Sequence, residues 1–284
     1  MDEAMRRALE AALALQLAWG ADEALDETPR DRRRASSPEA MRATLPAAAV
    51  PESPAPPSPI APTALATSPH ALPSPGGAVA EAERLAAAAA DLESLRRAIA
   101  EFGGLALRET ATNLVFADGN PAAPVMLIGE APGAEEDRAG KPFVGASGRL
   151  LDRMMASIGL DRHGTGWGSF YVTNIITWRP PGNRNPTDGE VALSLPFLRR
   201  HVVLVQPKLL LLLGAVAVRS LTGAREGITR LRGRWLTLEF DGLGSVPALA
   251  TLHPAYLLRN PGAKKDAWAD LIALRRRIDD LRQD

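Results

Sequence analysis

The sequence predicts an α/β fold, a three-layer sandwich in which helices cover both faces of a central, mostly parallel four-stranded sheet. Two observations support this class. From residue 125 onward, short apolar segments alternate with longer helical segments, which is the pattern of parallel strands joined by crossover helices. The apolar segments are dense runs, as is typical of strands that are buried on both faces.

The chain divides by composition into three parts. These are an N-terminal helix and charged tail at 1–34, a Pro/Ala-rich disordered linker at 35–78, and a globular domain at 79–284 with a leading helix at 79–100 and a core at 101–284. Apolar residues recur at helical spacing from Met5 to Leu17, which predicts an amphipathic helix. Ten of the 24 prolines lie between residues 46 and 75, and such a stretch cannot bury enough surface to fold.

The charge of the chain is unevenly distributed. Residues 1–100 carry 10 basic and 14 acidic side chains, and residues 101–284 carry 23 basic and 19 acidic side chains. A mildly basic globular part is compatible with a polyanionic partner but does not require one.

Composition also excludes several classes of protein. The chain has no cysteine, which excludes disulfides, thiolate metal sites and a thiol nucleophile. No segment is long and apolar enough for a transmembrane helix, and Asp2 and Glu3 oppose the positive start of a signal peptide. We therefore expect a cytoplasmic protein that does not associate with membranes.

The first predicted strand, residues 125–128, ends in an acidic turn at residues 129–137 that contains Gly, Pro and four carboxylates. Three of these acids fit the first turn of a helix, where they complement the helix dipole. Glu130 fits that explanation poorly, because it directly follows the strand and a buried carboxylate is costly without a reason. Ligands of open α/β sheets bind beyond the carboxyl ends of the strands, so we predict that the turn is functional.

The remaining elements follow from the same alternation. Residues 170–176 are β-branched and aromatic and predict the second strand, and the apolar run at 209–213 before Gly214 predicts the third. The fourth strand is predicted at 246–252, and helices are predicted at 150–158, 190–205, 215–222 and 264–282.

Four strand ends carry residues of chemical interest, namely Glu130, Asn174, Gly214 and His253. In a parallel sheet these ends lie along one edge and can converge. His253 is the histidine that we favour as functional, because the proline that follows it restricts it to an extended conformation.

Two further segments have two interpretations each. The loop 179–184, Arg-Pro-Pro-Gly-Asn-Arg, is either a tight surface turn or a rigid turn that offers guanidinium groups and amides to phosphate. Phe143 on its own predicts a core residue. Beside Asn174 it would be a stacking surface for a flat ring.

Together these motifs resemble the family 4 branch of the uracil-DNA glycosylase superfamily, over roughly residues 101–280. Their order and spacing match as well as their residue types. The segments that carry the resemblance are 129–137, 140–145, 171–174, 179–184, 231–235 and 253–259.

The resemblance implies a monofunctional DNA repair enzyme that flips uracil out of DNA and hydrolyses its N-glycosidic bond, without a lyase step. Phe143 would stack on uracil, the Asn174 amide would read O4 and N3–H, and His253 would support the charge that grows on O2. Glu130 or Glu136 would stabilise the sugar cation or position the attacking water, and the two roles stay open between them.

The resemblance also implies the contacts with DNA. Leu257 and Leu258 would form a wedge that fills the gap left by the extruded nucleotide, with Arg259 beside a phosphate. Asn183 would belong to the substrate site, and Arg184 beside it would contact DNA.

Two departures from the family pattern are visible. Ala131, in the substrate-binding turn, stands where the best-known branch of the superfamily has an Asp. The family holds a four-iron–four-sulfur cluster on four cysteines, and the matching positions here are Phe102, Leu105, Trp178 and Ser194. We therefore expect no cofactor and no metal, with packed side chains in place of the cluster.

We expect a monomer whose partner is uracil-containing DNA, and the N-terminal region leaves room for a repair or replication partner. The first alternative is a non-catalytic protein that binds uracil or damaged DNA, and the second is a nucleoside hydrolase. The sequence leaves open the substrate range beyond uracil, the preference for single or double strands and the role of residues 1–100.

Overall fold

The computed structural model describes residues 75–283. The N-terminal helix, the charged tail and the linker up to residue 74 lie outside the described residues.

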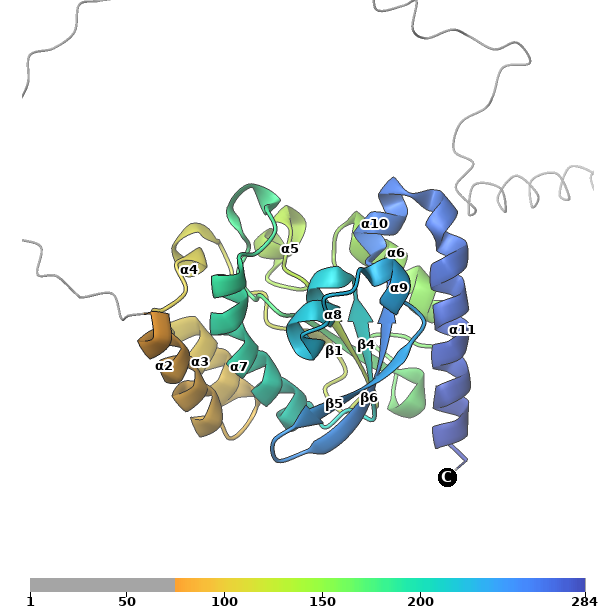
Figure 1. Cartoon of the computed structure of the whole chain (residues 1–284), viewed down its shortest axis with the longest axis horizontal. Helices are drawn as coiled ribbons and strands as arrows, with labels where there is room; N and C mark the ends of the chain where they lie inside the picture. Colours follow the sequence, from red (N-terminus) through yellow and green to blue (C-terminus); the bar gives the residue numbers. More distant parts are fainter. Residues whose placement is uncertain (1–74, 284) are drawn as a thin grey trace, which may run out of the picture. The chain divides into compact units, whose positions relative to one another are not determined.

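One sheet of six strands forms the centre of the domain, in the order β1-β3-β2-β4-β6-β5 (Figure 1). The four predicted strands are its parallel core, and two antiparallel strands at the edges add to them. The strands are β1 (Asp118–Gly119), β2 (Val125–Gly129), β3 (Phe170–Asn174), β4 (Leu209–Leu213), β5 (Trp235–Phe240) and β6 (Gly244–Thr251).

The expected count of four strands was therefore too low, for a physical reason at each edge. β1 pairs with β3 through only two residues. A strand of this length is too short to show the alternation of apolar and polar residues from which strands are predicted. In β5, exposed residues separate the buried Leu238 and Phe240, because only one face of this hairpin strand packs on the core.

Helices cover both faces of the sheet (Figure 1). They are α2 (Pro75–Ala88), α3 (Leu92–Glu101), α4 (Leu107–Thr110), α5 (Ala134–Ala139), α6 (Ala146–Ala156), α7 (Asp188–Val205), α8 (Ala215–Thr222), α9 (Ile228–Leu231), α10 (Pro254–Arg259) and α11 (Lys264–Leu281). Short 3₁₀ turns lie at Gly166–Gly168, Pro181–Asn183 and Pro261–Ala263.

Alternate side chains of each parallel strand point to opposite layers, as the pleat requires. In β2, Met126 and Ile128 pack into the core formed with α2, α3, α7 and α8. Val125 and Leu127 pack into the core formed with α6 and α11. β2, β3 and β4 are buried along their whole length and β6 is buried in its second half, which explains their continuous apolar sequence.

The predicted leading helix at 79–100 is two helices, α2 and α3. The Asp91 carboxylate accepts the N–H of Ser94 at 2.7 Å, and the Ser94 hydroxyl accepts the N–H of Asp91 at 3.0 Å. This capping box starts a new helix and so interrupts the first one. α2 begins at Pro75, inside the predicted linker, and proline is well suited to a first helical turn.

Within residues 75–283, none of the helices combines the length and the apolar character needed to cross a membrane.

Candidate active site

The carboxyl ends of the parallel strands lie at the edge of the sheet from which the chain continues into α5 and α10 (Figure 1). Gly129 of β2 lies in register with Asn174 of β3. A pocket of about 370 Å³ opens at this edge. Nine of the eleven predicted site residues line it, namely Glu130, Ala131, Glu136, Phe143, Asn174, Asn183, Arg184, His253 and Arg259.

Asn174 presents an unpaired acceptor to this pocket. Its side chain is buried, and Oδ1 has no hydrogen-bond partner among the described residues. A buried amide oxygen without a partner costs on the order of 1–3 kcal/mol. Gly129 allows the end of β2 to pack directly against this oxygen, because a Cβ at this position would collide with Asn174 Oδ1.

Phe143 forms the neighbouring wall. Its ring lies 5.6 Å from the ring of His253, centroid to centroid, with the planes tilted by 33°. A Cβ at Gly129 would lie 2.5 Å from Phe143 Cζ, so the same glycine makes room for the ring. The backbone of Phe143 has φ +53°, a left-handed conformation that non-glycine residues adopt rarely and usually at functional sites.

The two candidate carboxylates have different surroundings. Glu136 is buried, and its oxygens accept the N–H groups of Gly133 at 3.1 Å, Val144 at 3.1 Å and Gly145 at 2.8 Å. The Glu136 carboxylate therefore holds together the backbone of the acidic turn and of the Phe143 loop.

Glu130 lies at the wall of the pocket with its carboxylate free. Burial raises the pKa of Glu130, and the charge of Arg219 on α8 opposes that rise. No hydrogen bond from residues 75–283 contributes to this balance. Of the two acids, Glu130 is the one available to a water molecule or a developing cation.

His253 is the N-cap of α10, and its Nδ1 accepts the N–H of Ala255 at 3.2 Å. Burial, and then the charge of Arg259, lower the pKa of His253 to about 4, against the opposing charge of Glu136. The ring is therefore neutral near pH 7, and its proton is on Nε2. Gly214, at φ +92°, allows the close approach, since a Cβ there would lie 3.0 Å from the His253 Cβ.

The Pro-Pro-Gly loop closes another side of the pocket. Asn183 Oδ1 accepts the Arg179 Nε–H at 2.7 Å, and Arg179 also faces Asp137, at 3.9 Å. Arg184 donates two hydrogen bonds to Glu190, at 2.8 and 2.6 Å. This pairing lowers the pKa of Glu190 to about 2, so the Arg184 charge is already shared with an acid.

The two leucines predicted to form a wedge, Leu257 and Leu258, have different surroundings. Leu257 is 1% exposed and packs in a small apolar cluster with Leu150 and Leu252. Leu258 is 41% exposed, and neither residue lines the pocket. Successive positions of α10 point in different directions, so only Leu258 is free to meet a partner.

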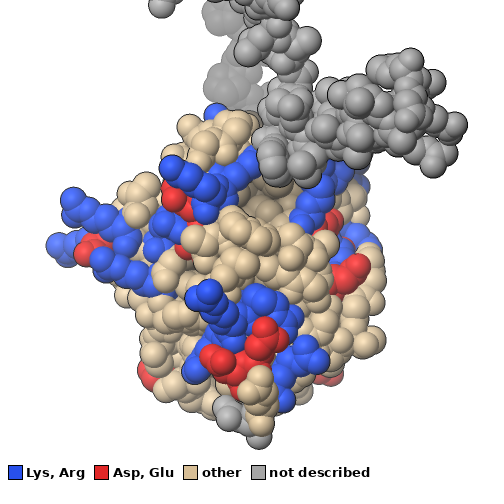
Figure 2. Space-filling model, turned by 90° about the vertical axis from the view of Figure 1, so that its right-hand side faces the viewer, with Lys and Arg blue, Asp and Glu red and all other residues tan. Residues whose placement is uncertain are grey.

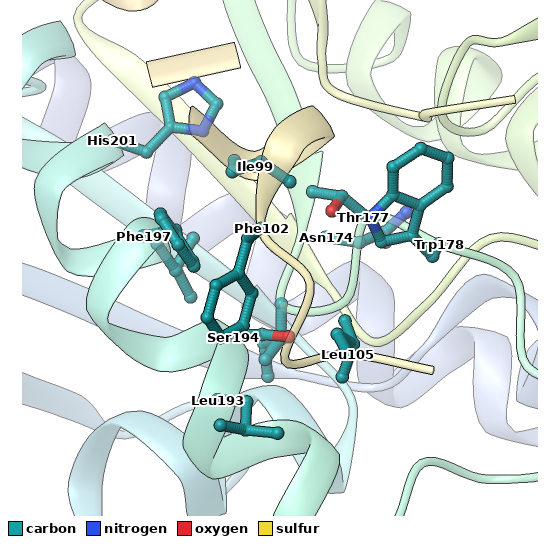
Figure 3. Close-up of a pocket in the computed structure, with 12 residues that line it drawn as sticks. Ile99, Phe102, Leu105, Asn174, Thr177, Trp178, Leu193, Ser194, Phe197 and His201 are labelled. Carbon is teal, nitrogen blue, oxygen red and sulfur yellow. The ribbon is translucent and has the colours of Figure 1, made fainter. Parts of the chain in front are cut away.

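The four positions expected to replace the cluster cysteines meet behind the pocket (Figure 3). Phe102, Leu105, Trp178 and Ser194 are all buried, and the space left between them is about 10 Å³. Phe102 and Phe197 pack with ring centroids 5.3 Å apart. One hydroxyl and three apolar side chains do not fit an iron–sulfur cluster, which needs thiolates and space.

We call this group of Phe102, Leu105, Trp178, Ser194 and Phe197 the apolar plug. Asn174 lines both the small space within the plug and the substrate-sized pocket. The plug therefore forms the backing of Asn174.

Sequence reasoning missed Ser147, Asn185 and Arg162. Ser147 and Asn185 line the pocket, and Ser147 stands in the first turn of α6, directly after the Phe143 motif. Its place directly after the Phe143 motif is the sequence feature from which Ser147 could have been predicted. Arg162 lies outside the quoted motifs, and only the folded contacts described below reveal it.

Lysine and arginine side chains are spread over the face that bears α11, with acids among them and uncharged surface between them (Figure 2). A mixed surface of this kind does not by itself indicate where a polyanion binds. Within residues 75–283 there is also no group of three or more His, Cys, Asp or Glu side chains arranged to hold a metal ion.

Comparisons with known proteins agree on one family. A model of the Uracil DNA glycosylase superfamily matches residues 116–272. A Type-4 uracil-DNA glycosylase of Pyrobaculum aerophilum is 34% identical over 64% of this chain and 91% of its own length. The enzymes of the same name from Archaeoglobus fulgidus and Thermotoga maritima are each 37% identical, over 58% and 52% of this chain and 81% and 73% of their own lengths.

Proposed function

The chain belongs to the uracil-DNA glycosylase superfamily, and on this premise we propose that its pocket removes uracil from DNA. The reaction is hydrolysis of the N-glycosidic bond in DNA repair, without a lyase step, and it leaves an abasic site. The observation that carries the assignment is the unpaired, buried Oδ1 of Asn174 at the wall of the pocket, beside the ring of Phe143.

Uracil presents the complementary groups to this wall. Its N3–H can donate to Asn174 Oδ1, and its O4 can accept from the Asn174 amide nitrogen. Cytosine has an acceptor at N3 and an amine in place of O4, so both contacts would be mispaired. The flat ring of Phe143 offers the stacking face that an extruded base needs.

His253 is the proposed electrostatic catalyst. When the bond between the sugar C1′ and uracil N1 breaks, its electron pair leaves with uracil, and charge grows on O2. The neutral His253 ring donates its Nε2–H to that oxygen, and a preorganised donor of this kind contributes ~3–4 kcal/mol. The hydrogen bond from Ala255 fixes the tautomer that is required.

Glu130 is the proposed partner of the sugar and water. A water oxygen bonds to C1′ as uracil leaves, and the proton that the water loses passes to the free carboxylate. The same negative charge stabilises the oxocarbenium-like sugar. Glu136 contributes indirectly in this scheme, because its oxygens already accept three backbone N–H groups.

Contact with the DNA backbone is proposed for Leu258 and Arg259 of α10. Leu258 is the exposed leucine of the pair, and Arg259 lines the pocket. An apolar side chain inserted into the base stack fills the gap left by the flipped nucleotide. Arg184 contacts a phosphate only if it shares its charge between that phosphate and Glu190.

We further propose that the domain folds without an iron–sulfur cluster. In support of this, the four positions that match the cluster cysteines belong to the apolar plug, and the chain has no cysteine to bind a cluster. Iron analysis of the purified protein is expected to find none, and iron at one cluster per chain would contradict this proposal. The monomeric state, the cytoplasmic location and an N-terminal partner stay predictions from the sequence.

A nicking assay tests the proposed function. Single- and double-stranded oligonucleotides with one uracil are incubated with the full chain and then treated with alkali, which cleaves at abasic sites. We expect cleavage at the uracil position, strongly reduced in His253→Ala and unchanged in His163→Ala, a control at an exposed histidine.

Two other outcomes would each replace the proposal. Tight binding of uracil-containing DNA without release of the base would indicate a non-catalytic binding protein. Release of base from free nucleosides, but from no polymer, would indicate a nucleoside hydrolase.

A further inference from the structure

We propose that Arg162 is a positioning residue that fixes Phe143 in the conformation used for base stacking. This inference rests on the proposed function, because it assigns to Phe143 the role of a stacking surface. Arg162 itself does not line the pocket. Its influence on the reaction would pass through the backbone of the loop that carries Phe143.

Arg162 is a buried arginine, and its side chain is 7% exposed. Its guanidinium donates to the carbonyl of Phe143 at 3.0 Å and to the carbonyl of Pro142 at 3.4 Å. Its carbon atom Cζ lies 5.8 Å from the centre of the Phe170 ring on β3. The guanidinium is thus anchored on the sheet and directed at the loop.

Two acids hold the guanidinium in place. Asp152 on α6 accepts from Nε at 2.9 Å and from Nη2 at 2.7 Å, and Asp118 on β1 accepts from Nη1 at 2.9 Å. Arg162 therefore links β1, α6 and the Phe143 loop. Because the two carboxylates already neutralise it and the side chain is buried, Arg162 is not available as a phosphate contact.

The contact matters because Phe143 is in a strained conformation. A left-handed backbone is unfavourable for a residue with a Cβ, so the surroundings must impose it. Glu136 holds the peptide N–H groups that follow Phe143, and Arg162 holds its carbonyl. The peptide group between Phe143 and Val144 is therefore hydrogen-bonded on both sides, its N–H to Glu136 and its carbonyl to Arg162.

Gly148 completes this arrangement. A Cβ on Gly148 would collide with the Phe143 carbonyl oxygen, so the first turn of α6 packs directly against that peptide group. Arg162 donates the hydrogen bond that this carbonyl accepts. Loss of the guanidinium would leave a buried carbonyl unpaired and would remove the restraint on the orientation of the Phe143 peptide.

The test compares Arg162→Met and Arg162→Lys with Arg200→Met. Arg200 is the control, because this half-buried arginine also donates to a backbone carbonyl, that of Ala89, and it does not line the pocket. The measurements are the single-turnover rate of uracil release, the dissociation constant for uracil-containing DNA and the melting temperature of each protein. All rates are measured below the melting temperature of every variant.

We expect Arg162→Met to lower the single-turnover rate by about 10-fold, because misplacement of a group that positions substrate has effects of this size or larger. Arg162→Lys should recover only part of the rate, since an ammonium lacks the planar fork. Arg200→Met should leave the rate unchanged even where it lowers the melting temperature. Equal rates for Arg162→Met and the natural protein would overturn the proposal.

A double-mutant cycle with Phe143→Ala separates positioning from general stability. If Arg162 acts through Phe143, Arg162→Met should change the rate by less than about 2-fold once the ring is gone. If Arg162 affects the rate by a route that does not pass through Phe143, the two effects should multiply, and this result would also overturn the proposal.

Asp152→Ala provides a second variant in case Arg162→Met does not fold. Asp152 is 46% exposed, and its removal takes away the acceptor of Nε and one of the two acceptors of Nη2, while Asp118 still neutralises Arg162. We expect about a 3-fold loss of rate that also disappears in the Phe143→Ala background. Failure of the natural protein to release uracil would refute the proposed function instead, so the two failures are distinguishable.

Discussion

Asn174 and Phe143 lie side by side against Gly129, and they form a candidate binding wall only in combination. The amide alone is a buried polar group without a partner, and the ring alone is a core residue. The glycine between them lets both side chains pack against the end of β2. Together they form a wall with one polar and one flat apolar part, which is what a pyrimidine requires.

Asn174→Asp should weaken the discrimination between uracil and cytosine. The substitution removes the donor to O4 and supplies acceptors that the cytosine amine can use, a change on the order of 1–3 kcal/mol. We expect uracil release to slow by at least ~10-fold and the ratio of the uracil to the cytosine rate to fall. Single-turnover rates on oligonucleotides that differ only in that base measure it, and an unchanged ratio would remove Asn174 from base recognition.

The different roles of the two acids could not be assigned from the sequence. Both follow the same strand, and both are carboxylates within one acidic turn. What separates them is the set of backbone N–H groups around each, and these come from a loop eight and nine residues beyond Glu136. Leu257 illustrates the same limit, since adjacent leucines look alike until the direction of each side chain is known.

At the level of elements, the register of β2 and β3 sets the width of the pocket. Gly129 lies opposite Asn174, and every larger residue at 129 would intrude between the amide and the Phe143 ring. The strand end is thus part of the substrate cavity.

Gly129→Ala should therefore inactivate the protein with only a modest loss of stability. The new methyl group would displace Asn174 Oδ1 and Phe143 Cζ, and overpacking of this kind typically costs ~1–3 kcal/mol. We expect the single-turnover rate to fall by about 100-fold with the far-ultraviolet circular dichroism unchanged. Gly103→Ala is the control, since nothing lies within 4 Å of a Cβ there. Normal activity in Gly129→Ala would show that the base does not bind at this wall.

The apolar plug ties α3, α7 and the end of β3 together. Phe102 follows α3 directly, Phe197 and Ser194 belong to α7, and Asn174 ends β3. A cluster of metal and thiolates would contribute folding free energy. Here the same position must be stabilised by burial of apolar surface.

Phe102→Ala should accordingly destabilise the domain by ~3–5 kcal/mol, the usual cost of removing a buried phenylalanine. Urea denaturation followed by circular dichroism measures this change. Trp268→Ala, which removes an aromatic side chain that is 47% exposed, should change stability by less than ~0.5 kcal/mol. Equal stability of Phe102→Ala and the natural protein would mean that the plug does not support the fold.

At the level of the whole molecule, the buried His201 and the half-buried His253 link stability to pH. Burial lowers the pKa of His201 to about 3, and burial followed by the Arg259 charge lowers that of His253 to about 4. In the unfolded chain both titrate near 6.5. Between these values the unfolded chain binds more protons, so stability is complete above pH ~6.5 and is lost as the pH falls.

We expect the free energy of unfolding to decrease by up to ~1.4 kcal/mol per pH unit for each histidine below pH ~6. Glu130 and Asp270, whose pKa values burial raises, act in the opposite direction near the acid end of this window. Urea denaturation at a series of pH values measures the slope of the free energy of unfolding against pH. His253→Gln should reduce this slope by the contribution of one histidine, because one fewer proton is taken up on unfolding. A stability that does not depend on pH between 5 and 6.5 would contradict the burial of these rings.

The parallel core of the fold could be predicted because its strands are buried on both faces and therefore carry unbroken apolar sequence. β1 and β5 could not, because the first is two residues long and the second alternates like a surface strand. The convergence of Glu130, Asn174 and His253 followed from the parallel sheet alone. The contacts of Arg162 depend on how separate loops pack, and no local pattern encodes them.

Asn174 stands between two compartments, the pocket proposed to receive the base and the small space filled by the plug. A change of volume among the buried residues behind it would move the amide that we propose selects the base, with no residue of the pocket itself altered. Substitutions in a protein interior usually have no effect until the molecule fails to fold. In this chain, a substitution behind Asn174 would change which base is removed before it changed folding, and its first visible effect would be a different spectrum of mutations in the genome.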